Sequence, residues 1–419
     1  MKGPGKLLAR SGPTGPGPAD APGFWLENEA HRDWLAADAL KQFDFFRKSK
    51  RKDGGFHTLD WKGKPLRSQL QELHSTTRMI HAYAMAELCG AGGADMVDHG
   101  MQYLAQGHAD GEGWAWGAEG SAPSDRRRMA YGHVFVLLAA SSAHLIGHPG
   151  GQPLIDQASQ VLMDHFWEEE SGLFGADFGP DWVPLDSYRG MNANMHGVEA
   201  LLAAYEATGW EDYLNRAGGI LGYFLGRMAP AYGWRIPEHY GPDWSVDLGY
   251  DGDPMFRPAG TTPGHSLEFA RLLLQHWDLS GRPENEAPSV AHDLAQQALT
   301  DGWSEDGGLI YTVDFDGAPL LTDRYWWPVT EGIGVLASLI KLDPQEIYEE
   351  WYRRLWTFAH EHFIDHKRGG WYPALNAKGK PVETQFKGKP DIYHALQATL
   401  YPLAPGLSRQ ITSLPLITA

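Results

Sequence analysis

The sequence predicts an all-α fold, an (α/α)6 barrel whose helices are joined by short β-hairpin turns. Two observations predict it: a glycine followed within three residues by an aromatic recurs in short polar turns, and the intervals between these turns read mostly as helix. The turns are Gly55-Phe56, Gly113-Trp114, Gly172 to Phe174, Gly233-Trp234, Gly308 to Tyr311 and Gly370 to Tyr372. Their aromatics are 58, 60, 60, 77 and 60 residues apart, so each repeat has room for two helices.

The spacing of apolar residues predicts helices within each repeat. Apolar residues at three- and four-residue spacing predict helices at 75–88, 129–145, 194–207, 266–277, 333–342 and 392–400. Second helices are expected at 152–167, 210–228 and 345–362. Six successive helical hairpins can close into a ring with an inner and an outer layer, which buries every apolar stripe. A linear helical solenoid has the same repeat chemistry, and the sequence does not distinguish it from a closed ring.

The chain is expected to hold one catalytic domain over residues 24–419. The Gly/Pro-rich segment 1–23 lacks the apolar core of a secretory signal and is expected to be a flexible leader. The longest interval between turns contains a Pro/Gly-rich stretch at 240–264, which we interpret as an inserted active-site loop.

Composition and charge exclude several classes of function. Of the 419 residues, 42% are hydrophobic and 21% charged, as in a folded globular protein. The net charge of 35 − 53 = −18 disfavours binding to nucleic acid or to a membrane surface. The single cysteine, Cys89, forms no intramolecular disulfide, so a cytoplasmic location is expected. The 17 Trp, 17 Tyr and 16 Phe suit the stacking of sugar rings.

One polar residue at or near a helix start follows each turn aromatic at a similar distance, and this register predicts a site. The residues are Arg78, Tyr131, His196, His265, Glu331 and His394, which lie 22, 17, 22, 31, 20 and 23 residues after the aromatics. In a closed ring, such positions converge at one end of the barrel. Neither a glycine-rich nucleotide loop nor a Gly-x-Ser-x-Gly motif is present in the sequence.

His265 and Glu268 lie three residues apart at a helix start, so we expect the carboxylate to orient the imidazole. A metal site is the alternative, because glutamate and histidine at this spacing also bind iron in helical bundles, but that requires a second such pair. We expect no metal. His360 and His362 are interpreted as surface histidines on an outer helix.

Three further side chains, Asn192, Trp326 and Trp327, complete the expected site. Asn192 is suited to capping the helix of His196 or to donating a hydrogen bond to a hydroxyl, although His196 fits a buried structural histidine equally well. Trp326 and Trp327 are expected to stack on a sugar. Arg78 needs a partner for its charge, with Glu331, Glu268 or the substrate as candidates.

At these residues the sequence resembles the N-acylglucosamine 2-epimerase superfamily, and within it the bacterial aldose–ketose isomerases that act on mannose or sulfoquinovose. The matching motifs are His74 to Arg78, Tyr131 to His133, Asn192 to His196, Pro263 to Glu268, Trp326 to Glu331 and Tyr393-His394. The resemblance implies an (α/α)6 barrel, a free monosaccharide substrate, no metal and no cofactor. It also implies that D-mannose and D-fructose are interconverted through a cis-enediol, with D-lyxose as a further substrate.

The resemblance also implies roles for the site residues. His394 corresponds to the base that moves the proton, and His265, supported by Glu268, to the group that opens the sugar ring. The remaining positions line the sugar site: Arg78, Tyr131, Asn192, His196, Trp326, Trp327 and Glu331. Arg78 and His196 are expected to stabilise the enediolate as donors.

Several alternatives remain open from the sequence. Arg257 is the one candidate for a second arginine beside Arg78, which favours mannose over sulfoquinovose. A sugar 2-epimerase would use His265 and His394 as two bases. A glycoside hydrolase would use two carboxylates such as Glu268 and Glu331, and a lectin-like binder would do no chemistry. The protein is expected to be a monomer or a homodimer.

Overall fold

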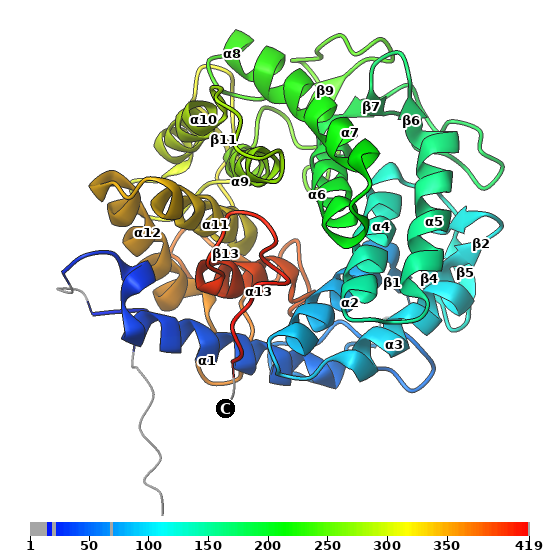
Figure 1. Ribbon diagram of the computed structural model, residues 1–419, viewed down its shortest axis with the longest axis horizontal. Coiled ribbons are helices and arrows are strands. Elements are labelled where there is room, and N and C mark those ends of the chain that lie inside the picture. The colour runs from blue at the N-terminus through cyan, green and yellow to red at the C-terminus, as the bar shows by residue number, and fades with distance from the viewer. Residues whose placement is uncertain (1–14, 19–21, 68–69, 418–419) are drawn as a thin grey trace, which may run out of the picture.

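A closed ring of helices forms the inner layer of the protein. The computed structural model describes residues 15–18, 22–67 and 70–417. The inner helices are α2 (Leu73–Leu88), α4 (Ala130–Leu145), α6 (Met191–Thr208), α9 (Pro263–Leu279), α11 (Trp326–Leu342) and α13 (Tyr393–Leu400). Each contacts the next, and α13 contacts α2, so the ring is closed (Figure 1). The predicted (α/α)6 barrel is therefore confirmed, and the linear solenoid is excluded.

The outer layer pairs one helix with each inner helix. Its members are α1 (Glu29–Phe46), α3 (Ala94–Tyr103), α5 (Gly151–Val161), α7 (Glu211–Leu221), α10 (Ala287–Gly302) and α12 (Glu346–Phe358). Helix α1 packs on α13, so the first long helix of the chain and the last helix of the ring meet side by side (Figure 1). The outer helices α3, α5, α7 and α12 continue into π-helical turns at Leu104–His108, Leu162–Phe166, Gly222–Met228 and Ala359–Phe363.

Short antiparallel strands connect the layers. Pairs β2–β3 (Ala109–Asp110, Gly113–Trp114) and β6–β7 (Trp167–Glu168, Leu173–Phe174) hold two of the predicted Gly-aromatic turns. The glycines Gly55, Gly172 and Gly370 have φ of 70°, 68° and 69°, a left-handed conformation that explains why glycine recurs there. Short helical turns complete the chain at Trp25–Glu27, Arg47–Ser49, Ala229–Ala231 and Tyr401–Leu403.

Other strands fix the N-terminal ends of the inner helices. β1 (Leu70–Glu72), β8 (Arg189–Gly190) and β12 (Arg324–Tyr325) each lie directly before an inner helix. β1 pairs with β4 (Gly117–Glu119), which pairs with β5 (Ala122–Asp125), while β8 pairs with β9 (His239–Tyr240) and β12 with β13 (Ala374–Leu375). A last pair, β10 (Thr312–Val313) and β11 (Pro319–Leu321), lies in the α10–α11 connection.

The core lies mainly between the two layers, and the inner helices are the most buried elements. In α11 every side chain from Trp326 to Ile340 is buried. Among the described residues no helix is long and apolar enough to cross a membrane. Of the predicted leader, residues 1–14 and 19–21 lie outside the described residues, whereas the carbonyls of Pro18 and Gly23 accept hydrogen bonds from Trp25 and Arg353.

Candidate active site

The N-terminal turns of the inner helices surround a cavity of about 440 Å³ at one end of the barrel. The structure brings nine of the ten predicted site residues to its wall: Arg78, Tyr131, Asn192, His196, His265, Glu268, Trp326, Trp327 and His394. They come from all six inner helices. The exception is Glu331, which is 2% exposed and lies behind His394.

His394 is paired with a buried carboxylate. Its Nδ1 lies 2.8 Å from Oε1 of Glu331, in the second turn of α11. Because an ionised carboxylate only accepts, Nδ1 carries the proton and Nε2 has a free lone pair. The sequence did not reveal this partner, because Glu331 comes from the neighbouring helix α11.

His265 is oriented by Glu238 and not by Glu268, which corrects the expectation from their spacing. Nδ1 of His265 lies 2.9 Å from both carboxylate oxygens of Glu238. Glu238 directly precedes β9, and its carbonyl accepts a hydrogen bond from the backbone N–H of Met191 at the start of α6. The side chain of Glu238 is 4% exposed and contacts His265 at the start of α9. On its other side, His265 stacks on Trp327, with 4.9 Å between ring centroids.

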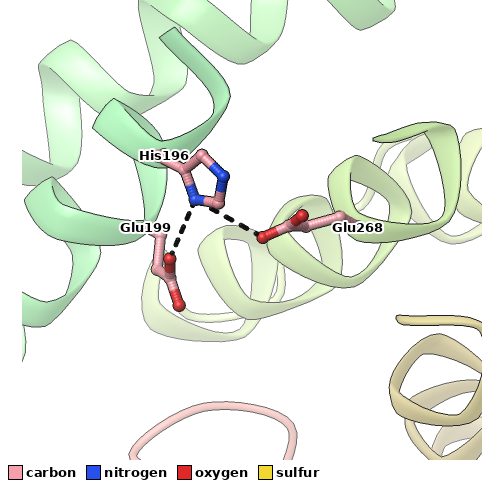
Figure 2. A group of neighbouring side chains, drawn as sticks. All are labelled: His196, Glu199 and Glu268. Carbon is pink, nitrogen blue, oxygen red and sulfur yellow. Dashed lines mark hydrogen bonds and ion pairs between the residues drawn. The ribbon is translucent and has the colours of Figure 1, made fainter. Parts of the chain in front are cut away.

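Glu268 instead belongs to a buried group around His196 (Figure 2). Nδ1 of His196 lies 3.3 Å from Oε2 of Glu199 and 3.6 Å from Oε1 of Glu268. Burial lowers the pKa of His196 to about 4, so its imidazole is neutral at physiological pH. Glu199 also accepts hydrogen bonds from the hydroxyl of Tyr393 and from Nε2 of Gln397, the latter at 3.1 Å.

The surroundings of Glu268 favour the protonated form of its carboxyl group. Burial and the neighbouring charges of Glu331 and Glu199 raise its pKa well above the usual range. Neither of its oxygens has a hydrogen-bond partner among the described residues, and the side chain is 1% exposed. It lines the cavity, so it presents a proton donor to a bound ligand.

Arg78 has a partner that the sequence did not identify. Nη1 lies 3.0 Å from Oδ2 of Asp391, and Nη2 donates to the hydroxyl of Tyr131 at 2.8 Å. Its guanidinium lies 4.6 Å from the ring centres of Phe135 and Tyr393. Burial opposes the charge, but the oxygens of Tyr131 and Asp391 raise the pKa of Arg78, which keeps it a permanent cation. The candidate partners Glu331 and Glu268 are thus replaced by a residue three positions before His394.

Aromatic side chains and the inserted loop cover the cavity. Trp326, Trp327, Tyr311 and Phe386 line it, together with Met255 and Phe256 from the insertion at 240–264. A second chamber of about 650 Å³ adjoins it and shares Tyr131, Asn192, Glu72 and Phe256.

Arg257 lies in the second chamber and not beside Arg78. Its guanidinium is 3.1 Å from Asp177 and 3.1 Å from Asp186. Arg257 is therefore already paired with two carboxylates. His360 and His362, predicted as surface residues, are half-buried on the turn that follows α12 and do not line either chamber.

Two groups of side chains have ligand atoms close enough to share a metal ion. They are His196, Glu199 and Glu268, and Glu268, Glu331 and His394, with the ligand atoms within 4.8 Å of one another in each group. In each group another carboxylate already accepts hydrogen bonds: Glu199 from Tyr393, and Glu331 from His394 and Arg271. The guanidinium of Arg271 lies beside the carboxyl groups of Glu268 and Glu331.

Comparison with known proteins agrees with this architecture. Residues 54–398 match the model of the family described as N-acylglucosamine 2-epimerase (GlcNAc 2-epimerase). A D-mannose isomerase of Thermobifida fusca is 40% identical over 92% of this chain and 98% of the relative. A D-mannose isomerase of Pseudomonas cannabina pv. alisalensis is 36% identical over 93% of this chain and 97% of the relative.

A solved structure of a relative has a similar fold. The crystal structure of a D-mannose isomerase superposes with a TM-score of 0.83 at 33% identity, covering 87% of this chain and 96% of that one. The family match spans most of the barrel, including every inner-helix residue that lines the cavity. The chain therefore belongs to the N-acylglucosamine 2-epimerase family.

Proposed function

We propose that the protein is an aldose–ketose isomerase that interconverts free D-mannose and D-fructose. One observation carries the proposal: His265 and His394 line one cavity, and the Nδ1 atom of each is bound to a buried carboxylate. Two imidazoles, each oriented through Nδ1 by a carboxylate, suit proton transfer. The two relatives that are named D-mannose isomerases and cover nearly all of this chain support the choice of sugar.

In the proposed reaction His394 moves the proton between the two carbons. Nε2 takes the proton from C2 of the open-chain aldose, which leaves a cis-enediolate, and returns it to C1 of the ketose. Glu331 stabilises the imidazolium that forms in between, because its ionised oxygen accepts the hydrogen bond from Nδ1. A single base on one face of the enediolate is sufficient for isomerisation.

The other cavity residues donate or accept hydrogen bonds at the sugar oxygens and stabilise the negative charge of the enediolate. Arg78 is the fixed cation for the developing enediolate, and one well-placed donor is worth about 3 kcal/mol. Neutral His196 is bound through Nδ1 to Glu199, so its Nε2 accepts from a sugar hydroxyl and does not donate, contrary to the sequence-based expectation. Protonated Glu268 supplies a donor for a sugar oxygen, and His265 serves ring opening.

Incubation with D-mannose in heavy water tests the proposed function. We expect D-fructose that carries deuterium at C1, detected by NMR, because the base exchanges its proton with solvent during some turnovers. D-Lyxose should give D-xylulose by the same steps. The absence of any ketose from either sugar, in a protein shown to be folded by circular dichroism, would overturn the proposal.

One observation favours a second candidate, a sugar 2-epimerase. The ring centroid of Trp327 lies 4.9 Å from that of His265 and 5.9 Å from that of His394, so both imidazoles lie close to the same aromatic ring. Two bases on opposite faces of C2 would invert it and yield D-glucose. Chromatography of the same incubation separates the candidates. The buried position of Glu331 behind His394 disfavours a glycoside hydrolase, which needs two carboxyl groups facing the substrate.

A further inference from the structure

Arg271 contacts the buried carboxylates but lies outside the cavity. It belongs to α9, one turn beyond Glu268, and is 2% exposed. Nε and Nη2 each lie 3.2 Å from Oε2 of Glu331, and Nη2 lies 3.7 Å from Oε1 of Glu268. Because it is not among the residues that line the cavity, Arg271 does not touch a bound sugar.

Glu331 is shared between Arg271 and His394. Its Oε1 accepts from Nδ1 of His394, and its Oε2 accepts from Arg271. The guanidinium therefore holds one oxygen of the carboxylate and leaves the other directed at the imidazole. The three residues come from α9, α11 and α13, so this chain of contacts also ties three consecutive inner helices together.

The charge around Glu331 makes Arg271 important for its ionisation. Burial and the charge of Glu199 oppose ionisation of Glu331, whereas Arg271 and His394 lower its pKa. The groups that face this carboxylate are Arg271 and Glu268 from α9, His394 from α13, Glu199 from α6 and Tyr401 after α13. The other buried arginine of the site, Arg78, is engaged with Asp391. Arg271 is thus the cation nearest to a cluster of three glutamates.

We propose that Arg271 is a positioning residue for proton transfer: it holds Glu331 ionised and oriented, and Glu331 in turn fixes the tautomer of His394. The inference rests on the proposed isomerase function for its kinetic consequence. Its structural part, the state of the His394–Glu331 hydrogen bond, is independent of which sugar the protein converts.

A double-mutant cycle with Glu331 provides the kinetic test. Arg271→Met should lower kcat for D-mannose about 10-fold to 100-fold and change KM less than about threefold, because the residue acts on the base and not on binding. The acid limb of the kcat pH profile should move to higher pH, since Glu331 becomes protonated more readily. In the Glu331→Gln background the same substitution should cost less than about twofold, because its target is gone. Equal losses in both backgrounds, or an unshifted acid limb, would overturn the proposal.

Two variants control for folding and for general effects of removing an arginine from an ion pair. Arg271→Lys keeps the charge but loses the forked contact, so an intermediate loss of kcat is expected. Arg235→Met removes an arginine that binds Asp301 through Nε at 2.7 Å and Nη2 at 3.0 Å and does not line the cavity. It should leave kcat and the pH profile unchanged. A loss with Arg235→Met equal to that with Arg271→Met would contradict a specific role.

An NMR measurement separates failure of this inference from failure of the proposed function. The Nδ1 proton of His394, assigned by its disappearance in His394→Gln, should resonate at low field in the wild type, as expected for a hydrogen bond to a carboxylate. In Arg271→Met the signal should be lost at a pH where the wild type retains it. An unchanged signal would overturn the inference even if the protein makes fructose. A changed signal would support it even if no ketose forms.

Discussion

Glu331 accepts a hydrogen bond from His394: Nδ1 of the imidazole lies 2.8 Å from Oε1 of the carboxylate, and both side chains are buried. This direction leaves Nε2 as the basic atom of His394. It also places a negative charge next to the imidazole, which stabilises the imidazolium formed when a carbon-bound proton is taken up.

Removal of the imidazole should therefore abolish proton transfer and spare binding. In His394→Gln we expect kcat for D-mannose to fall about 10²-fold to 10⁴-fold, the usual contribution of general acid–base catalysis. Deuterium incorporation from heavy water into mannose and fructose, followed by NMR, measures the transfer directly. His360→Gln is the matched control, because His360 lies on an outer turn away from the cavity. Undiminished exchange in His394→Gln would remove this residue from the role of base.

The pair of Glu238 and His265 predicts a different defect. Glu238→Gln keeps the shape of the side chain but removes the charge that fixes Nδ1–H, so kcat/KM for D-mannose should fall about 10-fold. If His265 opens the sugar ring, an open-chain analogue should keep its turnover in both Glu238→Gln and His265→Gln. Glu206→Gln, at a buried carboxylate that accepts from Gln275, is the control. Equal losses on cyclic and open-chain substrates would contradict the ring-opening role.

Much of the fold could be predicted because the inner helices have a strong periodic pattern. The segment 75–88 predicted from apolar spacing corresponds to α2, and 129–145 to α4. Helix α1 was not predicted, because its buried face includes Asp38 and Gln42 and so lacks a continuous apolar stripe. α11 begins seven residues earlier than predicted, because Trp326 to Ile333 lack the polar face that a surface helix would show.

Only the site residues near the starts of the inner helices could be predicted from the sequence. Side chains near the starts of inner helices share one end of the barrel, and this register identified five residues of the cavity wall: Arg78, Tyr131, His196, His265 and His394. Glu238 and Asp391 lie in connecting loops, where no periodic rule relates them to His265 and Arg78. Glu238 contacts His265 and the backbone N–H of Thr262 across 27 and 24 residues, and spacing alone does not reveal these contacts.

Buried neutral histidines should make the fold sensitive to acid. Burial lowers the pKa of His31, His81, His108, His133 and His196 to about 4. Between about pH 6.5 and pH 4 the unfolded chain binds protons at these positions and the folded chain does not, so stability falls as the pH falls. Each histidine contributes at most about 1.4 kcal/mol per pH unit in this window.

Urea unfolding at pH 7 and at pH 5 measures this effect. The free energy of unfolding should be lower at pH 5 than at pH 7. The difference should shrink in His108→Gln, which removes one of the five histidines and does not alter the cavity wall. Equal free energies at the two pH values would show that these histidines do not stay neutral in the folded protein.

The buried ion pair of Arg78 and Asp391 predicts coupled losses of stability and activity. Oδ2 of Asp391 lies 3.0 Å from Nη1 of Arg78, and its Oδ1 accepts from the backbone N–H of Tyr393 at the start of α13. Asp391→Asn preserves the shape of the side chain and an oxygen that accepts from Tyr393 N–H, but it leaves a buried cation without its counter-charge. Removal of one partner of such a pair costs about 3–5 kcal/mol.

A second substitution separates the charge from the catalytic contribution. Asp391→Asn should lower the thermal unfolding temperature and kcat/KM for D-mannose, and adding Arg78→Met should restore part of the stability, because no uncompensated charge is left. The double variant should stay inactive, because the donor that stabilises the enediolate is gone. If Asp391→Asn alone proves as stable as the wild type, the charge of Arg78 is compensated by other groups, and Asp391 serves only to fix the start of α13 that carries His394.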